Sequence, residues 1–193
     1  VSPADPGMLF FSSGSTGKPK GILGAHRGVC LQLWRWRKWL ALDECVRSWS
    51  ANGFFWSGNF AIGIGGTLSA GGALVLQPTF QAEEAIALMD AERVSYLFAW
   101  PHQWAQLMDA KNYLEADLSA LRYLDVNSPI TRHPSVHAGH FDPSHGYGNT
   151  ETFTLTTAFP ANTPKAITGD SYGAVVAGNT IKIVDPLTGN TVT

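Results

Sequence analysis

A turn rich in glycine and hydroxyl side chains lies between two apolar segments near the start of the 193-residue chain. The residues before it, Met8–Phe11, predict a short buried strand. Gly14 and Gly17 allow the backbone to turn tightly and to approach a ligand without an intervening Cβ atom. Backbone N–H groups, hydroxyls and two lysines together suit phosphate oxygens. The side chains that contribute to this predicted phosphate-binding loop are Ser12, Ser13, Ser15, Thr16, Lys18 and Lys20.

Two other interpretations of this turn fit the sequence less well. A flexible Gly/Ser linker rarely follows a strongly apolar run directly, and it rarely ends in Lys-Pro-Lys-Gly before another apolar segment. The Walker A loop has Gly-Lys-Ser/Thr beginning five residues after its first glycine. Pro19 stands five residues after Gly14, so the Walker pattern fails.

A second glycine-rich turn, residues 146–152, follows about 130 residues later. Gly146 and Gly148 flank Tyr147, and an aromatic ring in such a turn can stack on a purine. Thr150 offers a hydroxyl to phosphate, and Glu151 offers a hard oxygen ligand for Mg²⁺. The plain alternative is an ordinary turn.

Both turns resemble motifs of the adenylate-forming enzymes, which include acyl-CoA synthetases, nonribosomal adenylation domains and luciferases. Residues 12–21 resemble the family's Ser/Thr/Gly-rich phosphate loop, and residues 147–151 resemble its Tyr-Gly-x-Thr-Glu motif, in the expected order. The resemblance implies that Tyr147 stacks on adenine beside Gly148. It also implies that Thr150 contacts the α-phosphate of ATP and that Glu151 binds magnesium, so that these two residues are the catalytic candidates.

Two further segments resemble the family more loosely. Asn127 and Ser128, before Pro129, take the place of the turn that lies against the adenine. Phe55 and Trp56 take the place of an aromatic motif near the acyl pocket, with Trp56 at a position often held by His. For these aromatic residues, pocket lining and plain core packing are equally open.

The order of apolar segments predicts an α/β fold with a mainly parallel sheet covered by helices. Ligands in such sheets bind beyond the carboxyl ends of the strands. We expect an α/β subdomain core over residues 1–155 and the start of a β-rich subdomain over 156–193. The resemblance implies that the family's C-terminal lid domain lies beyond this piece. The expected strands are Met8–Phe11, Lys20–Ala25, Val46–Ala51, Ala73–Gln77, Val94–Ala99 and Leu121–Val126; the expected helices are His26–Leu42, Ala61–Ala70, Gln81–Ala91 and one starting at Pro101.

The helix over His26–Leu42 has a clear periodic pattern. One face holds Val29, Leu33, Trp36 and Leu40, and Cys30 and Trp34 widen it. Gln32, Arg35 and Lys38 are expected on the outer side of the helix.

The segment between the adenine turn and the second motif is short and holds His133, His137, His140 and His145 with Asp142. Imidazoles and a carboxylate can bind zinc. Prolines and a glycine interrupt regular structure there, so we favour a surface loop with solvated histidines. Asp170, in a Thr-Gly-Asp that precedes the expected position of the ribose aspartate, is interpreted as a loop residue.

Composition narrows the remaining choices. The chain is 45% hydrophobic and 15% charged, as a well-packed globular protein is. A net charge of −2 gives no reason to expect a nucleic-acid partner. Cys30 and Cys45 form no disulfide framework, which agrees with a cytoplasmic location. No apolar run is long enough to span a membrane.

Taken with the resemblance, these features predict an enzyme that activates a carboxylic acid with ATP and Mg²⁺ and passes the acyl group to CoA. We expect the chain to be a piece of a larger enzyme and to be inactive alone. Two alternatives remain: an adenylation domain that loads a carrier-protein thiol, and a non-catalytic nucleotide-binding or interaction module.

Overall fold

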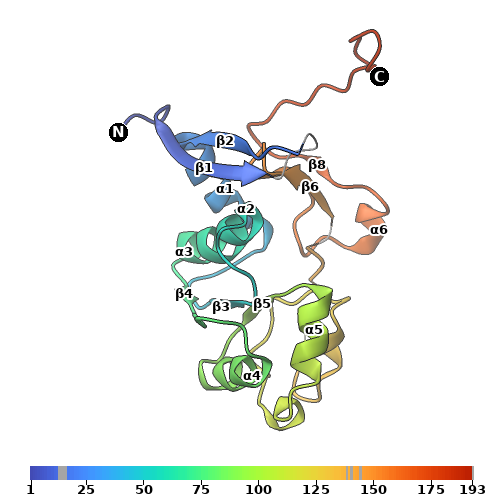
Figure 1. Cartoon of the computed structure of the whole chain (residues 1–193). Helices are drawn as coiled ribbons and strands as arrows, with labels where there is room; N and C mark the ends of the chain where they lie inside the picture. Colours follow the sequence, from blue (N-terminus) through green and yellow to red (C-terminus); the bar gives the residue numbers. More distant parts are fainter. Residues whose placement is uncertain (13–16, 138, 140, 144, 193) are drawn as a thin grey trace.

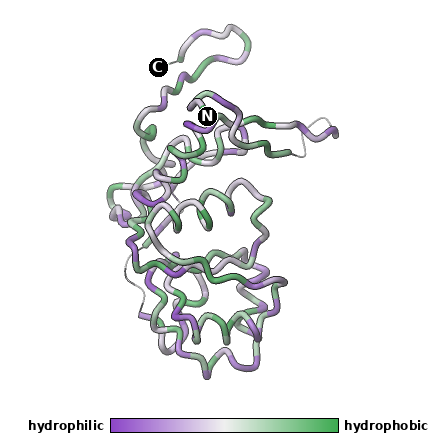
Figure 2. The backbone as a smooth tube through the Cα atoms, turned by 90° about the vertical axis from the view of Figure 1, so that its left-hand side faces the viewer, coloured by the Kyte–Doolittle hydropathy of each residue, from purple (hydrophilic) through white to green (hydrophobic). Residues whose placement is uncertain are grey.

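The computed structural model describes residues 1–12, 17–137, 139, 141–143 and 145–192. Four predicted phosphate-loop residues, Ser13, Gly14, Ser15 and Thr16, lie outside these ranges, as does His140. Both termini lie at the same end of the molecule, and the segment after β8 extends away from the body (Figures 1 and 2).

Strands pair into three small sheets. A parallel sheet has the order β4-β3-β5, an antiparallel hairpin joins β1 to β2, and a second antiparallel sheet has the order β6-β7-β8. The parallel sheet confirms the predicted α/β class, and the third sheet lies in the C-terminal part of the chain. The strands are β1 (Pro6–Ser12), β2 (Lys20–Ala25), β3 (Arg47–Ser50), β4 (Ala73–Leu74), β5 (Tyr96–Phe98), β6 (Gly146–Asn149), β7 (Thr154–Ala158) and β8 (Ala174–Val175).

Helices cover the parallel sheet. The helix α1 contacts η1, α3 and the β1–β2 hairpin, whereas α4 and α5 pack on each other in the lower part of the molecule (Figure 1). The helical segments are α1 (His26–Trp39), α2 (Ser57–Asn59), the π-helix η1 (Phe60–Gly66), α3 (Thr67–Ala70), α4 (Ala82–Ala91), α5 (Pro101–Met108), the 3₁₀ turns η2 (Tyr113–Glu115) and η3 (Pro129–Arg132), and α6 (Lys165–Thr168). None of the described helices is long and apolar enough to cross a membrane.

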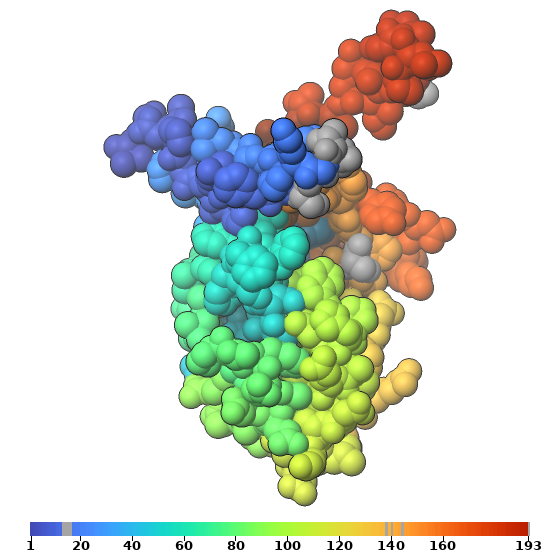
Figure 3. Space-filling model, in the orientation of Figure 1, coloured from blue at the N-terminus to red at the C-terminus, as the bar shows by residue number. Residues whose placement is uncertain are grey.

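Buried apolar side chains form two clusters. One lies around β3, β5, α4 and α5 and includes Trp49, Ile86, Leu107 and Leu124. The other lies under α1, η1 and α3 and includes Trp36, Trp39 and Leu40. The β1–β2 hairpin lies outside both clusters and projects from the body (Figure 3).

The outer face predicted for α1 is wrong in part. Gln32 and Arg35 were expected outside but are only 4% and 8% exposed, whereas Trp34 is 49% exposed and Cys30 is also exposed. The reason is tertiary, because the segments around residues 152–155 and Ala177 lie over this side of α1 and accept hydrogen bonds from it.

The strand predicted over Leu121–Val126 is reduced to one parallel bridge between Tyr96 and Tyr123. The backbone amides of Arg122 and Tyr123 both donate to the carbonyl of Ser95, and Val126 N–H then donates to Phe141 O. The segment 121–126 therefore pairs with β5 over a short distance and then enters the turn that holds Asn127 and Ser128.

Candidate active site

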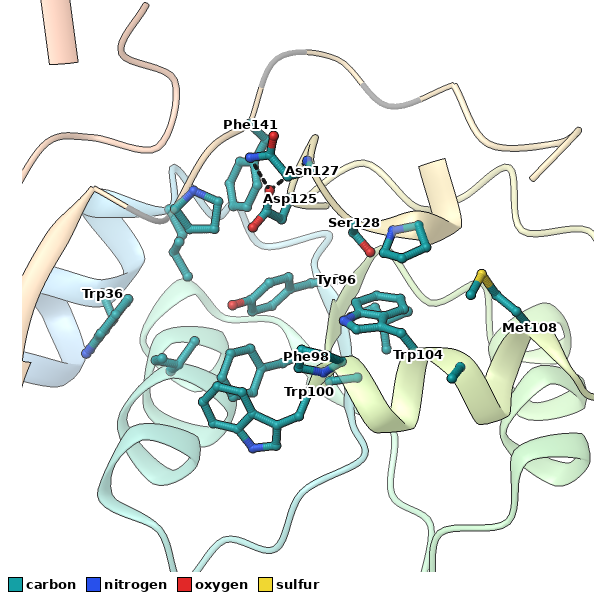
Figure 4. A pocket seen from close by; sticks show the side chains of 18 residues that line it. Trp36, Tyr96, Phe98, Trp100, Trp104, Met108, Asp125, Asn127, Ser128 and Phe141 are labelled. Atoms are coloured by element: carbon teal, nitrogen blue, oxygen red, sulfur yellow. Dashed lines mark hydrogen bonds between the residues drawn. The ribbon is translucent and has the colours of Figure 1, made fainter. Parts of the chain in front are cut away.

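A cavity of about 590 Å³ opens beyond the carboxyl end of β5 (Figure 4). The chain leaves β5 through Trp100 and begins α5 at Pro101, a residue suited to the first helical turn. Gln103 Oε1 accepts from Trp100 N–H at 2.8 Å, and Gln103 Nε2 donates to Ala51 O at 3.0 Å. These bonds fix the start of α5 against the residue that follows β3.

The walls of this cavity are largely aromatic. Phe98 and Trp100 lie with their ring centroids 5.6 Å apart, and Trp36 from α1 lines another wall. Tyr96, Trp104, Met108 and Phe141 complete the aromatic and sulfur-bearing lining. None of these side chains was predicted from the sequence to line a binding site. The signal available was their place after a predicted parallel strand, where α/β sheets bind ligands.

One edge of the cavity is polar and includes Asn127 and Ser128, two of the predicted adenine-turn residues. Asp125 Oδ1 accepts from the backbone N–H of Asn127 at 2.8 Å and from its Nδ2 at 3.1 Å, as Figure 4 shows. Ser128 Oγ is buried and has no hydrogen-bond partner within the part of the chain that the structure describes. A buried hydroxyl without a partner is costly, and a ligand atom could satisfy it.

Tyr96 faces the same space. Burial, and secondarily the negative charge of Asp125, raise the pKa of its phenol. A phenol is protonated at neutral pH even at its ordinary pKa, so Tyr96 can donate a hydrogen bond into this space.

The predicted second motif forms β6 and the turn after it. Gly148 is required by close approach, because a Cβ atom there would lie 1.1 Å from Thr154 O across the β6–β7 pair. Tyr147 is 55% exposed, and Glu151 is exposed on the turn. Thr150 lies between them in sequence and is partly buried.

The strand that enters the phosphate loop lies beside this turn. Phe10 in β1 stacks on Phe153 with ring centroids 5.7 Å apart and an interplanar angle of 27°. Phe60 of η1 contacts both rings, at 6.1 and 6.4 Å. The end of β1 therefore lies next to the Thr150–Glu151 turn, although the two are far apart in sequence (Figure 1).

The described flanks of the phosphate loop are open to solvent. Ser12 ends β1 and is partly buried, whereas Gly17, Lys18 and Lys20 are exposed. Gly17 has a φ of 81°, a conformation that favours glycine. Both lysine side chains are therefore open to solvent on the described side of the loop.

Phe55 and Trp56 lie elsewhere. They are 74% and 62% exposed, their rings lie 5.5 Å apart, and they do not belong to the lining of the aromatic cavity. Their assignment to a substrate pocket stays a prediction.

The histidine segment differs from the expected solvated loop. His133 is buried, its Nε2 lies 2.7 Å from Tyr113 O, and its Nδ1 lies 2.9 Å from Ser135 Oγ. Its ring packs edge-on against Tyr113 in the body of the molecule. His137 is exposed, and His145 lies 3.3 Å from Asp142. No group of three metal-binding side chains occurs among the described residues.

A family model for AMP-binding enzymes matches residues 1–193. The chain belongs to the AMP-binding enzyme family. Among curated members, 4-coumarate–CoA ligase-like 2 of Arabidopsis thaliana is 28% identical over 98% of this chain and 34% of its own length. Indoleacetate–CoA ligase of Aromatoleum aromaticum is 28% identical over 79% of this chain and 30% of its own length.

Solved structures agree with the AMP-binding assignment. The anthranilate CoA ligase AuaEII in complex with anthranoyl-AMP matches 99% of this chain and 38% of its own, with a TM-score of 0.73 and 25% identity. Apo MatB from Rhodopseudomonas palustris has the same fold, with a TM-score of 0.75 and 18% identity over all of this chain and 38% of its own. The chain therefore spans well under half the length of these relatives.

Proposed function

We propose that the protein carrying this chain is an AMP-forming ligase that activates a carboxylic acid with ATP and transfers the acyl group to CoA. The observation that carries the proposal is the stacking of Phe10 on Phe153, which places the end of β1 beside the Thr150–Glu151 turn. An ATP molecule needs phosphate contacts and adenine contacts within one cleft, and this packing supports such a cleft.

The chemistry follows from charge and position. A carboxylate oxygen of the acid attacks the α-phosphorus of ATP, and the bond to pyrophosphate breaks. Residues 12–20, with the Lys18 and Lys20 ammonium groups, hold the departing phosphates, and the Thr150 hydroxyl contacts the α-phosphate. Tyr147 stacks on adenine. A thiol then attacks the carbonyl carbon of the acyl-adenylate and releases AMP. Catalysis of this kind rests on positioning and on electrostatic stabilisation of phosphate charge.

Glu151 fits a magnesium ion. Its carboxylate is exposed on the turn, no ion pair or hydrogen bond to it occurs among the described residues, and carboxylate oxygens are preferred Mg²⁺ ligands. When bound, the ion neutralises phosphate charge. Glu151 would hold the ion, and Thr150 beside it in sequence would contact the α-phosphate.

The aromatic cavity is our proposal for the acid. Its volume of about 590 Å³ lies in the range of small-molecule sites, and apolar walls with a few polar groups are typical of them. The walls suit a planar or apolar acyl group, with Ser128 and Asn127 at the polar edge. CoA is favoured over a carrier-protein thiol because the relatives named above are CoA ligases.

Pyrophosphate–ATP exchange tests this function on the longest natural protein that carries the chain. With a panel of aromatic and aliphatic acids, we expect acid-dependent exchange, followed by acyl-CoA formation when CoA is added. Glu151→Gln should lower exchange by about 10²- to 10³-fold. The exposed Glu115→Gln on η2 is the matched control and should leave the rate unchanged.

Absence of exchange with every acid, or ATP hydrolysis that ignores the acid, would refute the proposal. Residues 1–193 alone are expected to bind nucleotide weakly and to show no exchange. Robust carboxylate-dependent exchange by this isolated piece would contradict that expectation.

A further inference from the structure

Helix α1 holds the segment that follows Glu151 through one buried amide. Gln32 Nε2 donates to Thr152 O at 3.0 Å and to Leu155 O at 2.7 Å. These two carbonyls come from the residue after Glu151 and from the second residue of β7. One side chain therefore hydrogen-bonds to both ends of residues 152–155, which connect the Thr150–Glu151 turn to β7.

The backbone between these two carbonyls is strained. Phe153 has a φ of 49° and Thr154 a φ of 82°, and side-chain-bearing residues rarely adopt such values. Strained residues persist only where surrounding contacts hold them. Here the contacts are the two bonds from Gln32, a bond from Trp36 Nε1 to Thr154 Oγ1 at 2.8 Å, and the stacking of Phe153 on Phe10.

The other side of the turn is closed locally. Thr152 N–H donates to Asn149 Oδ1 at 2.9 Å, and Phe153 N–H donates to Thr150 O at 3.0 Å. These bonds fix the shape of the turn but do not attach it to the rest of the molecule. Besides the β6–β7 pairing and the Phe153–Phe10 stack, the attachment of Thr150 and Glu151 to the rest of the molecule runs through α1.

Arg35 fixes the orientation of the Gln32 amide. Its Nη1 donates to Gln32 Oε1 at 3.1 Å, and its Nη2 donates to Ala177 O. Because Oε1 accepts from Arg35, both N–H groups of Nε2 are directed to the carbonyls of Thr152 and Leu155. Burial lowers the pKa of the Arg35 guanidinium from its ordinary value, but Arg stays protonated at any physiological pH.

We propose that Gln32 is a positioning residue, which holds Thr150 and Glu151 in the orientation that ATP and magnesium require. This inference rests on the proposed function for its chemical consequence. Gln32 touches no reacting atom, and it acts only through the backbone of residues 152–155. Supporting groups of this kind typically contribute 10- to 100-fold to metal affinity or activity.

The experiment uses the longest natural protein with Gln32→Met, which keeps the length of the side chain and removes both donated bonds. The matched control is Arg37→Met, since Arg37 also lies on α1 and donates to Ser69 O at 3.1 Å, away from the turn. Hydrogen exchange of the peptide covering residues 149–156 is measured without substrates. We expect exchange at least tenfold faster in Gln32→Met and unchanged exchange in Arg37→Met.

Kinetics provide the second measurement. Gln32→Met should lower kcat/KM for Mg·ATP in pyrophosphate exchange by about 10- to 100-fold, through a lower kcat or a higher KM for Mg·ATP. The KM for the acid should stay within about twofold of wild type. If Gln32→Met fails to fold, Gln32→Glu is used, because a carboxylate still accepts from Arg35 but cannot donate to the two carbonyls.

Each outcome decides something. Unchanged hydrogen exchange would overturn the attachment, whatever the protein catalyses. Faster exchange with unchanged Mg·ATP kinetics would overturn the positioning role, as would an equal loss for acid and nucleotide. A wild-type protein with no acid-dependent exchange would overturn the proposed function, and with it the chemical part of this inference, while hydrogen exchange still decides the attachment.

Discussion

Two regions of the molecule are built differently. The body consists of the parallel sheet with α4 and α5, and the motif layer consists of the β1–β2 hairpin, β6, β7 and the turn between β6 and β7. In the body, Ile86, Leu107 and Leu124 are fully buried between α4, α5 and the parallel sheet. In the motif layer, Tyr147 is half-exposed and Lys18 and Lys20 are exposed. The turn is held by hydrogen bonds from α1, by the Phe153–Phe10 stack and by the β6–β7 pairing. The body therefore supplies most of the buried apolar packing, whereas the motif layer leaves the predicted nucleotide-binding side chains open and holds strained backbone at Phe153 and Thr154.

The largest expected effect on the free energy of unfolding comes from a cavity in the apolar core of the body. Leu107→Ala removes a fully buried side chain and should lower the free energy of unfolding by about 2–5 kcal/mol, measured by urea denaturation. Leu114 is 73% exposed nearby, and Leu114→Ala should stay within about 0.5 kcal/mol of wild type. Equal effects of the two variants would show that the body is not the stabilising region.

A smaller effect is expected from a single methyl group in the motif layer. Gly148→Ala places Cβ against Thr154 O, so β6 must move from β7, and the free energy of unfolding should fall by about 1–3 kcal/mol. Binding of Mg·ATP, measured by calorimetry, should be lost.

The control for this change is Gly28→Ala, since a Cβ atom on this α1 residue meets nothing within 4 Å. Alanine is the better helix former, so urea denaturation should show a gain of about 0.5–1 kcal/mol. Nucleotide binding retained in Gly148→Ala would argue against the role of the close β6–β7 approach.

The smallest effect concerns a surface ion pair of the body. Hydrogen bonds from Ser119, together with Arg93 at 2.5 Å, hold the pKa of Asp117 at about 2, below its ordinary value of 3.8. A depressed pKa means that this contribution to stability is present above pH 3.8 and is lost as the pH falls toward 2. Carbon NMR titration of the Asp117 carboxyl measures it, and a midpoint near 3.8 would refute the depressed pKa. In the pH dependence of the free energy of unfolding, Asp117→Asn should remove only the decrease between pH 3.8 and about 2.

Much of the fold could be predicted from local patterns. The strand–turn–strand around the phosphate loop, the helix after it, and the α4 and α5 segments follow from apolar periodicity, from glycine and from Pro101, because these signals act over a few residues. The roles of Tyr147, Thr150 and Glu151 follow from the resemblance of their motif and stay predictions, whereas Asn127 and Ser128 lie at the cavity edge.

What the sequence by itself determined is the set of motifs and the family to which they belong, because both are written in short runs of residues. Only the tertiary structure decided that Gln32 and Arg35 are buried, that His133 packs against Tyr113, and that an aromatic cavity forms from Trp36, Trp100 and Trp104. The partners of Gln32 lie 120 and 123 residues away. No periodicity within a helix can report a contact that depends on where a distant segment comes to rest.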